Sequence, residues 1–155
     1  MEGFLELLEA SALAQTLRRS VWLYPVANVS HVLGLMAFFA AVAAMDVKAL
    51  RSSNPADLRG FIGRLRPVAI LLLAVLVTTG LLLFLPEATH IAHNTVFQTK
   101  LAVIGLALLN VIALQKALRG AAPAAPIPRS VRLIALASLV LWLAVAALGR
   151  LIAYF

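Results

Sequence analysis

Four long apolar segments constrain what this chain can fold into more than any other feature of its sequence. They cover residues 21–45, 67–85, 97–118 and 131–151, and each is near the roughly 20 apolar residues that a helix needs to cross a bilayer. Apolar residues make up 63% of the chain, against roughly 45–50% in ordinary soluble domains. We therefore predict an all-α integral membrane four-helix bundle, with residues 1–155 forming a single transmembrane domain.

The segments between and before these spans are more polar. In residues 1–18, apolar side chains recur at roughly helical spacing with glutamates between them, which predicts an amphipathic helix lying in the membrane interface. Residues 51–66 are expected to form a turn followed by a short helix. We expect residues 86–94 to form a short loop, and the proline-containing residues 119–129 to form an irregular linker.

The basic residues predict how the chain is oriented. The net charge is +7, from 13 Lys or Arg and 6 Asp or Glu. Nine of the 13 basic residues lie in or beside the connections after the first and third spans: Lys48, Arg51, Arg59, Arg64, Arg66, Lys116, Arg119, Arg129 and Arg132. The positive-inside rule then makes these connections cytoplasmic and both termini periplasmic, in a multi-pass protein of the bacterial inner membrane. Topology and contact with anionic phospholipids account for the charge, so no nucleic acid partner is predicted.

Polar residues inside the spans are the candidate functional residues, because they are costly in lipid. His31 lies near mid-membrane, with Asn28 one turn before it and Gly34 one turn after it. Imidazole is a common axial ligand of haem and a common ligand of copper, and Gly34 would let a flat ligand or a neighbouring helix approach the ring closely. The alternative is a hydrogen bond from His31 to a Thr or Asn of another helix.

Two cations lie at the same outer rim of the predicted bundle. Lys100 is near the start of the third span, and Arg150 is near the end of the fourth. Together they would suit an acidic group, such as a haem propionate or the carboxylate of a substrate. Alternatively, each long side chain snorkels to the interface and contacts lipid phosphates.

Glu87, His90 and His93 give a second candidate metal site, with the pattern E-x-x-H-x-x-H. On a helix, this spacing would bring the three side chains to one face. Two imidazoles and a carboxylate suit copper or zinc, and one of these histidines could also be a distal haem ligand. A solvated loop without a metal remains the alternative. The chain has no cysteine, which excludes thiolate metal sites and disulfides.

The remaining polar residues are interpreted mainly as packing residues. The hydroxyls of Thr78 and Thr79 are expected to bond preceding carbonyls, and Gly80 to allow close packing between helices. Asn110 is expected to make a comparable interhelical bond. Asp46, at the end of the first span, is expected to pair with Lys48 or another basic residue.

Several short motifs occur in an order found in known membrane proteins. His31-Val32-Leu33-Gly34, Asp46, Thr79-Gly80 and Lys100-Leu101 follow one another, and the chain closes with Gly149-Arg150-Leu151-Ile152-Ala153-Tyr154. Over residues 20–155 this resembles an uncharacterised family of small bacterial four-helix membrane proteins that end in G-R-x-I-A-Y. That family is similar to the copper-resistance-D and membrane protoporphyrinogen oxidase types. In the oxidase type, a histidine and a lysine matching His31 and Lys100 are functional, and haem b is the cofactor.

Three functions are compatible with these residues. In the first, the protein is a haem b module for electron transfer or redox chemistry near the periplasmic side, working with a quinone or a periplasmic redox partner. It would then be an oxidoreductase or a subunit of one. In the second, it transports copper or another metal ion past Glu87, His90, His93 and His31. In the third, it binds no cofactor and anchors a larger complex or an oligomer.

Overall fold

A computed structural model describes residues 2–122, 126–152 and 154. All the regular structure in this part of the chain is helical, as predicted. The elements are α1 (Glu2–Glu9), α2 (Ala12–Arg19), α3 (Leu23–Arg51), α4 (Pro55–Phe84), the 3₁₀ turn η1 (Leu85–Glu87), α5 (Ala88–His93), α6 (Thr95–Gly120) and α7 (Arg129–Leu151). Four of these regions, built on α3, α4, α6 and α7, are long and apolar enough to cross a membrane. The chain is therefore a multi-pass membrane protein whose apolar helices face a lipid bilayer.

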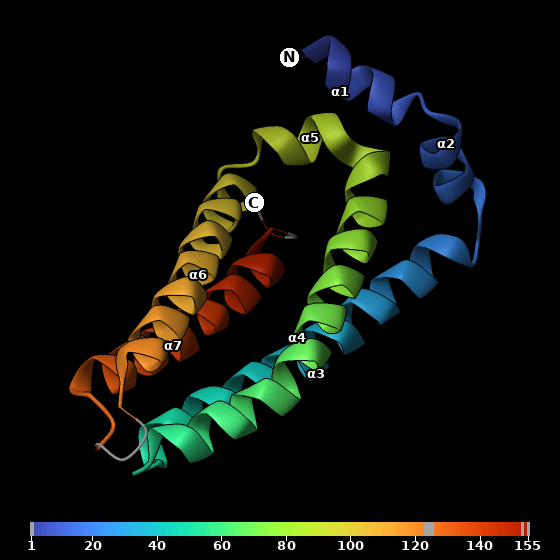
Figure 1. The fold of residues 1–155 in the computed structure, drawn as a ribbon. Coiled ribbons are helices and arrows are strands. Elements are labelled where there is room, and N and C mark those ends of the chain that lie inside the picture. The colour runs from blue at the N-terminus through green and yellow to red at the C-terminus, as the bar shows by residue number, and fades with distance from the viewer. Residues whose placement is uncertain (1, 123–125, 153, 155) are drawn as a thin grey trace.

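The four long helices form two antiparallel hairpins (Figure 1). Helix α3 packs along α4, α6 packs along α7, and the hairpins meet mainly where α3 contacts α7. They lie close together at the end that holds the α3–α4 connection, the closed end, and they separate toward α5, the open end (Figure 1). At the closed end, Arg59 Nη2 donates to the carbonyl oxygen of Ala121 over 2.7 Å, and this hydrogen bond connects the two hairpins.

An apolar core fills the contact between α3 and α7. Phe38 and Trp142 meet edge to face, with ring centroids 4.7 Å apart and an interplanar angle of 78°. Val42, Ala107 and Val145 are buried around them. Many other apolar side chains of the long helices are exposed, as expected for surfaces that contact lipid rather than water.

The structure corrects the predicted connection over residues 51–66. Helix α4 already begins at Pro55 and continues through Pro67, so there is no separate short helix. The Asn54 side chain accepts a hydrogen bond from Ala56 N at 2.8 Å, and Pro55 takes the first turn, where its missing N–H has no cost. The cap thus starts the helix before the apolar span begins.

Two segments outside the long helices, residues 1–18 and 86–94, also differ from the prediction. The single helix predicted over residues 1–18 is two helices, because Ser11 ends α1 and caps α2 by accepting from Ala14 N at 3.2 Å. The loop predicted over residues 86–94 is largely helical, since η1 and α5 occupy it. Within the predicted linker, the described residues between α6 and α7 lie outside any helix, and residues 123–125 lie outside the described part.

Candidate functional site

The most defined polar contact inside the helix bundle joins His31 of α3 to Thr79 of α4. The His31 Nδ1 atom lies 2.8 Å from Thr79 Oγ1. The Thr79 hydroxyl also lies 2.7 Å from the carbonyl oxygen of Val75, to which it donates its one proton. Because a carbonyl oxygen can only accept, these distances favour Thr79 Oγ1 as the acceptor toward His31 and Nδ1 as the donor.

This arrangement fixes which nitrogen of His31 is free. A neutral imidazole that donates from Nδ1 keeps an unprotonated Nε2 with a lone pair. Histidines that bind metals usually donate their other ring N–H to a neighbouring acceptor, which sets the tautomer and the ring orientation. The interhelical hydrogen bond predicted as the alternative role of His31 is therefore present, and it leaves Nε2 available to a ligand.

Gly80 provides the space beside the His31 ring. A Cβ atom at Gly80 would lie 3.4 Å from His31 Cε1, tighter than most such contacts. Gly34 was predicted to leave room for a flat ligand or a neighbouring helix, and the structure shows the second: a Cβ at Gly34 would meet the side chains of Leu76 and Val75 of α4, at 3.5 and 3.7 Å. Gly34 thus lets α3 approach α4. The cause is the helix register, which aims Gly34 at α4 side chains.

Lys100 of α6 joins this cluster from the other hairpin. Its side chain is partly buried and lies on Gly149 of α7, where a Cβ would be 3.4 Å from Nζ. Lys100 is near the start of α6 and His31 near the start of α3, so both lie at the end of the bundle that holds α5. We name His31, Thr79, Lys100 and Gly149 the outer cluster, to which each long helix contributes one residue.

Two predicted site residues lie outside the outer cluster. Asn28 is exposed on α3. Arg150 is exposed on α7, where its Nη2 donates to the Tyr154 hydroxyl at 2.9 Å and its guanidinium lies 5.0 Å from the centre of the Tyr154 ring. Lys100 and Arg150 are thus on the same end of the bundle, with Arg150 turned toward the C-terminal tyrosine.

The structure does not form the metal site predicted from Glu87, His90 and His93. All three side chains are exposed, and within the described residues no three His, Cys, Asp or Glu side chains are grouped to hold a metal ion. Helix α5 spans only Ala88–His93, and Glu87 before it has φ −134° and ψ 35°, outside the helical range. The carboxylate is therefore not in helical register with the two imidazoles.

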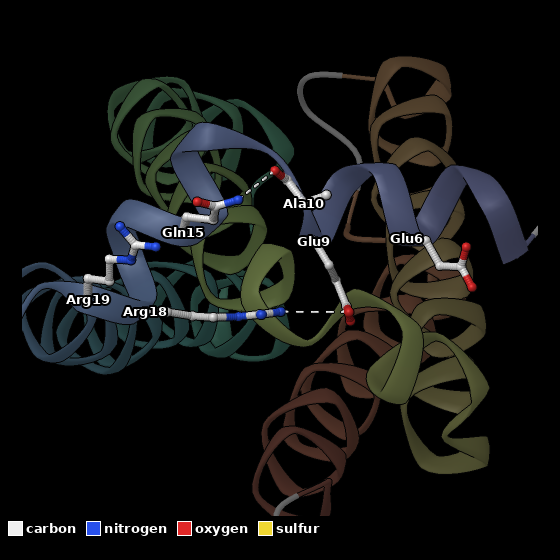
Figure 2. Close-up of a pocket in the computed structure, with 6 residues that line it drawn as sticks. All are labelled: Glu6, Glu9, Ala10, Gln15, Arg18 and Arg19. Atoms are coloured by element: carbon white, nitrogen blue, oxygen red, sulfur yellow. Dashed lines mark hydrogen bonds and ion pairs between the residues drawn. The ribbon is translucent and has the colours of Figure 1, made fainter.

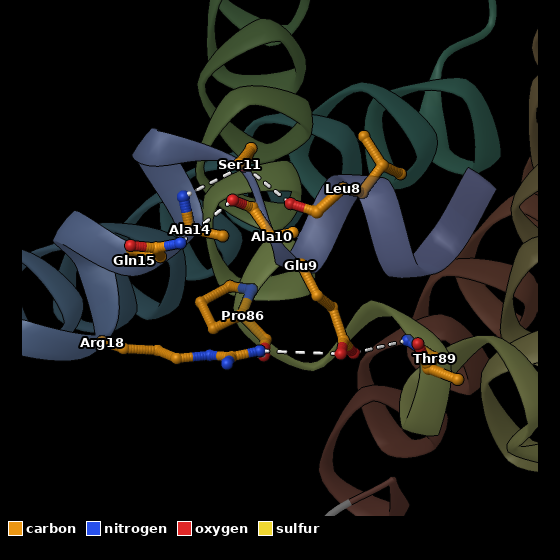
Figure 3. A network of polar contacts seen from close by, with 9 residues as sticks. All are labelled: Leu8, Glu9, Ala10, Ser11, Ala14, Gln15, Arg18, Pro86 and Thr89. Atoms are coloured by element: carbon orange, nitrogen blue, oxygen red, sulfur yellow. Dashed lines mark hydrogen bonds and ion pairs between the residues drawn. The ribbon is translucent and has the colours of Figure 1, made fainter. Parts of the chain in front are cut away.

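The N-terminal helices dock on η1 and α5 through a polar network that the sequence analysis missed (Figure 3). Glu9 accepts from Thr89 N at 2.7 Å and pairs with Arg18 at 3.6 Å. Arg18 donates through Nε and Nη2 to the carbonyl oxygen of Pro86, over 2.9 Å for Nε. Figure 2 shows Glu9 and Arg18 lining an open depression of about 590 Å³, together with Glu6, Ala10, Gln15 and Arg19.

The distance along the chain explains why this network was not predicted. Glu9 and Pro86 lie far apart in sequence, and a backbone acceptor leaves no trace in residue type. The network attaches α1 and α2 to the connection between α4 and α6, at the end of the bundle that holds the outer cluster (Figure 1).

Comparison with known proteins gives one match. The model of a family of unknown function, DUF6644, matches residues 65–155, which is more than half of the chain. No curated protein and no solved structure matches the chain. The matched region contains Thr79, Lys100 and Gly149, while His31 lies before it.

Proposed function

The chain belongs to the DUF6644 family, and we propose that it is a haem b-binding redox module of a bacterial inner membrane, with His31 as an axial ligand. The observation that carries this proposal is the hydrogen bond from His31 Nδ1 to Thr79 Oγ1. With Nδ1 as the donor, Nε2 would be unprotonated and the ring held in one orientation, which an axial imidazole requires.

Each other residue of the outer cluster has a role in this proposal. Thr79 positions the imidazole, and Gly80 keeps the ring edge free of side-chain bulk. Lys100 would pair with a propionate, because its ammonium is partly buried, has no acidic partner within the described part of the chain, and so favours a carboxylate beside it. Arg150 would serve a second propionate if it left Tyr154.

Haem b would supply one-electron redox chemistry, and the protein would supply ligation, orientation and burial. An electron partner would be a quinone within the bilayer or a redox protein on the periplasmic side. The protein would act as an oxidoreductase or as a subunit of one. The positive-inside rule supports an orientation with both termini in the periplasm, which would place the outer cluster in the periplasmic half of the membrane.

Metal-ion transport is less well supported than haem binding. A copper route would need ligands at its entrance, and Glu87, His90 and His93 are exposed without forming a three-ligand group in the described residues. A protein that anchors a larger complex without a cofactor would give a different result in the following experiment.

The test is the absorption spectrum of the protein purified in detergent from haem-replete cells. We expect a Soret band and reducible α bands that disappear in His31→Ala. The matched control is a His90→Ala/His93→Ala variant, which should keep both features because these imidazoles are exposed on α5. A wild-type protein without haem, or a spectrum unchanged in His31→Ala, contradicts the proposal. A colourless protein that co-purifies with a stoichiometric partner supports the anchor role instead.

A further inference from the structure

A second polar site lies at the other end of α3, where Asp46 faces α7. Its side chain is 2% exposed, although it is a carboxyl group in a membrane helix. The Ser138 hydroxyl of α7 faces the carboxyl and is also 2% exposed. In the described residues, Asp46 Oδ2 has no hydrogen-bond partner. This group lies fifteen positions after His31 on the same helix, about 22 Å along the axis.

Among residues 2–122, 126–152 and 154, no cation forms an ion pair with this carboxyl. Lys48 was expected to pair with Asp46, and that expectation was wrong: Lys48 Nζ lies 2.7 Å from Asp57 Oδ2 on α4. The other ion pair of the described residues joins Arg18 to Glu9. In the described residues, no charged group on α3 or on the helices that contact it, α2, α4 and α7, makes an ion pair with Asp46. Besides Lys48, Asp57 and Arg18, these groups are Arg19, Arg51, Arg59, Arg64, Arg66, Arg129, Arg132 and Arg150.

The surroundings of Asp46 also lack solvent. Val42 lies one turn before it on α3, and Phe38 and Trp142 fill the α3–α7 contact beyond. An ionised carboxylate buried without a cation is very costly, and such groups are normally found in the neutral form. A neutral carboxylic acid has one O–H donor, and the Ser138 hydroxyl can accept from it.

We propose that Asp46 is a proton-binding site inside the membrane bundle, where the carboxyl carries an exchangeable proton and uses it to donate a hydrogen bond to the Ser138 hydroxyl oxygen. The carboxylate takes one proton from a hydronium ion to become the acid, water is released, and no other reactant is needed. The proton would enter from the α3–α4 connection, since Asp46 precedes Ser52 by six positions, about 9 Å of helix. This inference goes beyond haem binding and does not depend on it.

Infrared spectroscopy of the full chain in lipid nanodiscs tests this proposal at neutral pH. A neutral carboxylic acid gives a C=O stretching band that a carboxylate lacks. The chain has two aspartates, Asp46 and Asp57, so labelling with [4-¹³C]aspartate identifies the residue type without any mutation. We expect a band that shifts on ¹³C labelling and shifts slightly again in D₂O, because the proton exchanges.

Three variants assign the band to one side chain. Asp46→Asn should abolish it, and Asp57→Asn should leave it unchanged, because Asp57 is exposed and paired with Lys48. Ser138→Ala removes only a hydroxyl and should move the band to higher frequency, as expected when a hydrogen bond is lost. If Asp46→Asn does not fold, the isotope label and Ser138→Ala still assign the band. If the wild type shows no label-sensitive band, the carboxyl is ionised and the proposal is overturned. This outcome includes a carboxylate that is neutralised by a bound sodium ion.

Discussion

Helix α3 carries two polar side chains in very different surroundings. His31 is half-buried near the open end of the two hairpins, and Thr79 satisfies its Nδ1 proton. Asp46 is fully buried near the closed end, and one of its oxygens has no partner in the described residues. The first arrangement orients a group toward a ligand, whereas the second favours the neutral form of an acid. Burial alone therefore does not indicate what a polar residue in a membrane helix does; its partners do.

The largest effect on the His31 side should come from filling the space at Gly80. In Gly80→Val, the added methyl groups would push the imidazole away from Thr79, since even a Cβ would lie 3.4 Å from Cε1. Overpacking of this kind costs about 1–3 kcal/mol, so we expect haem affinity to fall by up to about 100-fold. Haem titration of the apoprotein measures this.

The matched control for this variant is Gly105→Val on α6. A Cβ at Gly105 would meet no atom within 4 Å, so this variant should bind haem like the wild type. Equal affinities in Gly80→Val and Gly105→Val would show that His31 does not need the space beside Gly80.

Removing the acceptor of His31 should have the next largest effect. Thr79→Val keeps the shape of the side chain but loses the oxygen that lies 2.8 Å from Nδ1. Changes to such supporting groups typically lower metal affinity by about 10–100-fold, and we expect the lower end of this range for haem. Thr78→Val is the control, because that hydroxyl is exposed and bonds only Ala74 O in the described residues. Equal losses in both variants would argue against a positioning role for Thr79.

The sequence could predict the spans and His31 because the physics behind them is local. Twenty apolar residues specify a membrane helix wherever they occur, and a histidine among them is costly in any register. The carbonyl bonds of Thr78 and Thr79 were predicted for the same reason, and they are confirmed at 2.9 and 2.7 Å. The interhelical bond of Asn110 is also confirmed, with Nδ2 donating to Ile134 O at 3.0 Å.

The remaining features depend on how helices are placed against each other. Which α4 residue lies beside the His31 imidazole is decided by the register between α3 and α4, which hydropathy does not contain. The pairing of Lys48 with Asp57 rather than Asp46 follows from the early start of α4 at Pro55. Gly149 beside Lys100 depends on the register between α6 and α7 in the same way.

A smaller effect is expected from removing the Lys100 charge. In Lys100→Met, haem affinity should fall about fivefold, which corresponds to about 1 kcal/mol for a partly solvated ion pair. The midpoint potential should also fall, because a positive charge near the haem favours the reduced form. Lys116→Met, at the other end of α6, should change neither quantity. If Lys100→Met leaves the midpoint potential of the haem unchanged, Lys100 does not lie beside the haem.

The smallest effect is expected on the Asp46 side of the comparison. If the carboxyl is neutral, Asp46→Asn replaces it with a group of nearly the same shape, and the free energy of unfolding should change by no more than about 0.5 kcal/mol. Breaking a buried ion pair would instead cost about 3–5 kcal/mol. Unfolding in a detergent mixture measures the difference, and a loss in the larger range would mean that Asp46 is ionised and paired.

The central claim is that His31 donates from Nδ1 and presents an unprotonated Nε2. It is tested most directly by ¹⁵N NMR of histidine-labelled, haem-free protein in which His90→Gln and His93→Gln leave His31 as the one histidine. We predict the chemical shifts of a neutral ring with the proton on Nδ1 at pH 7, and loss of that tautomer preference in Thr79→Val. A ring protonated on Nε2 would contradict the account, because the nitrogen assigned to the ligand would already hold a proton.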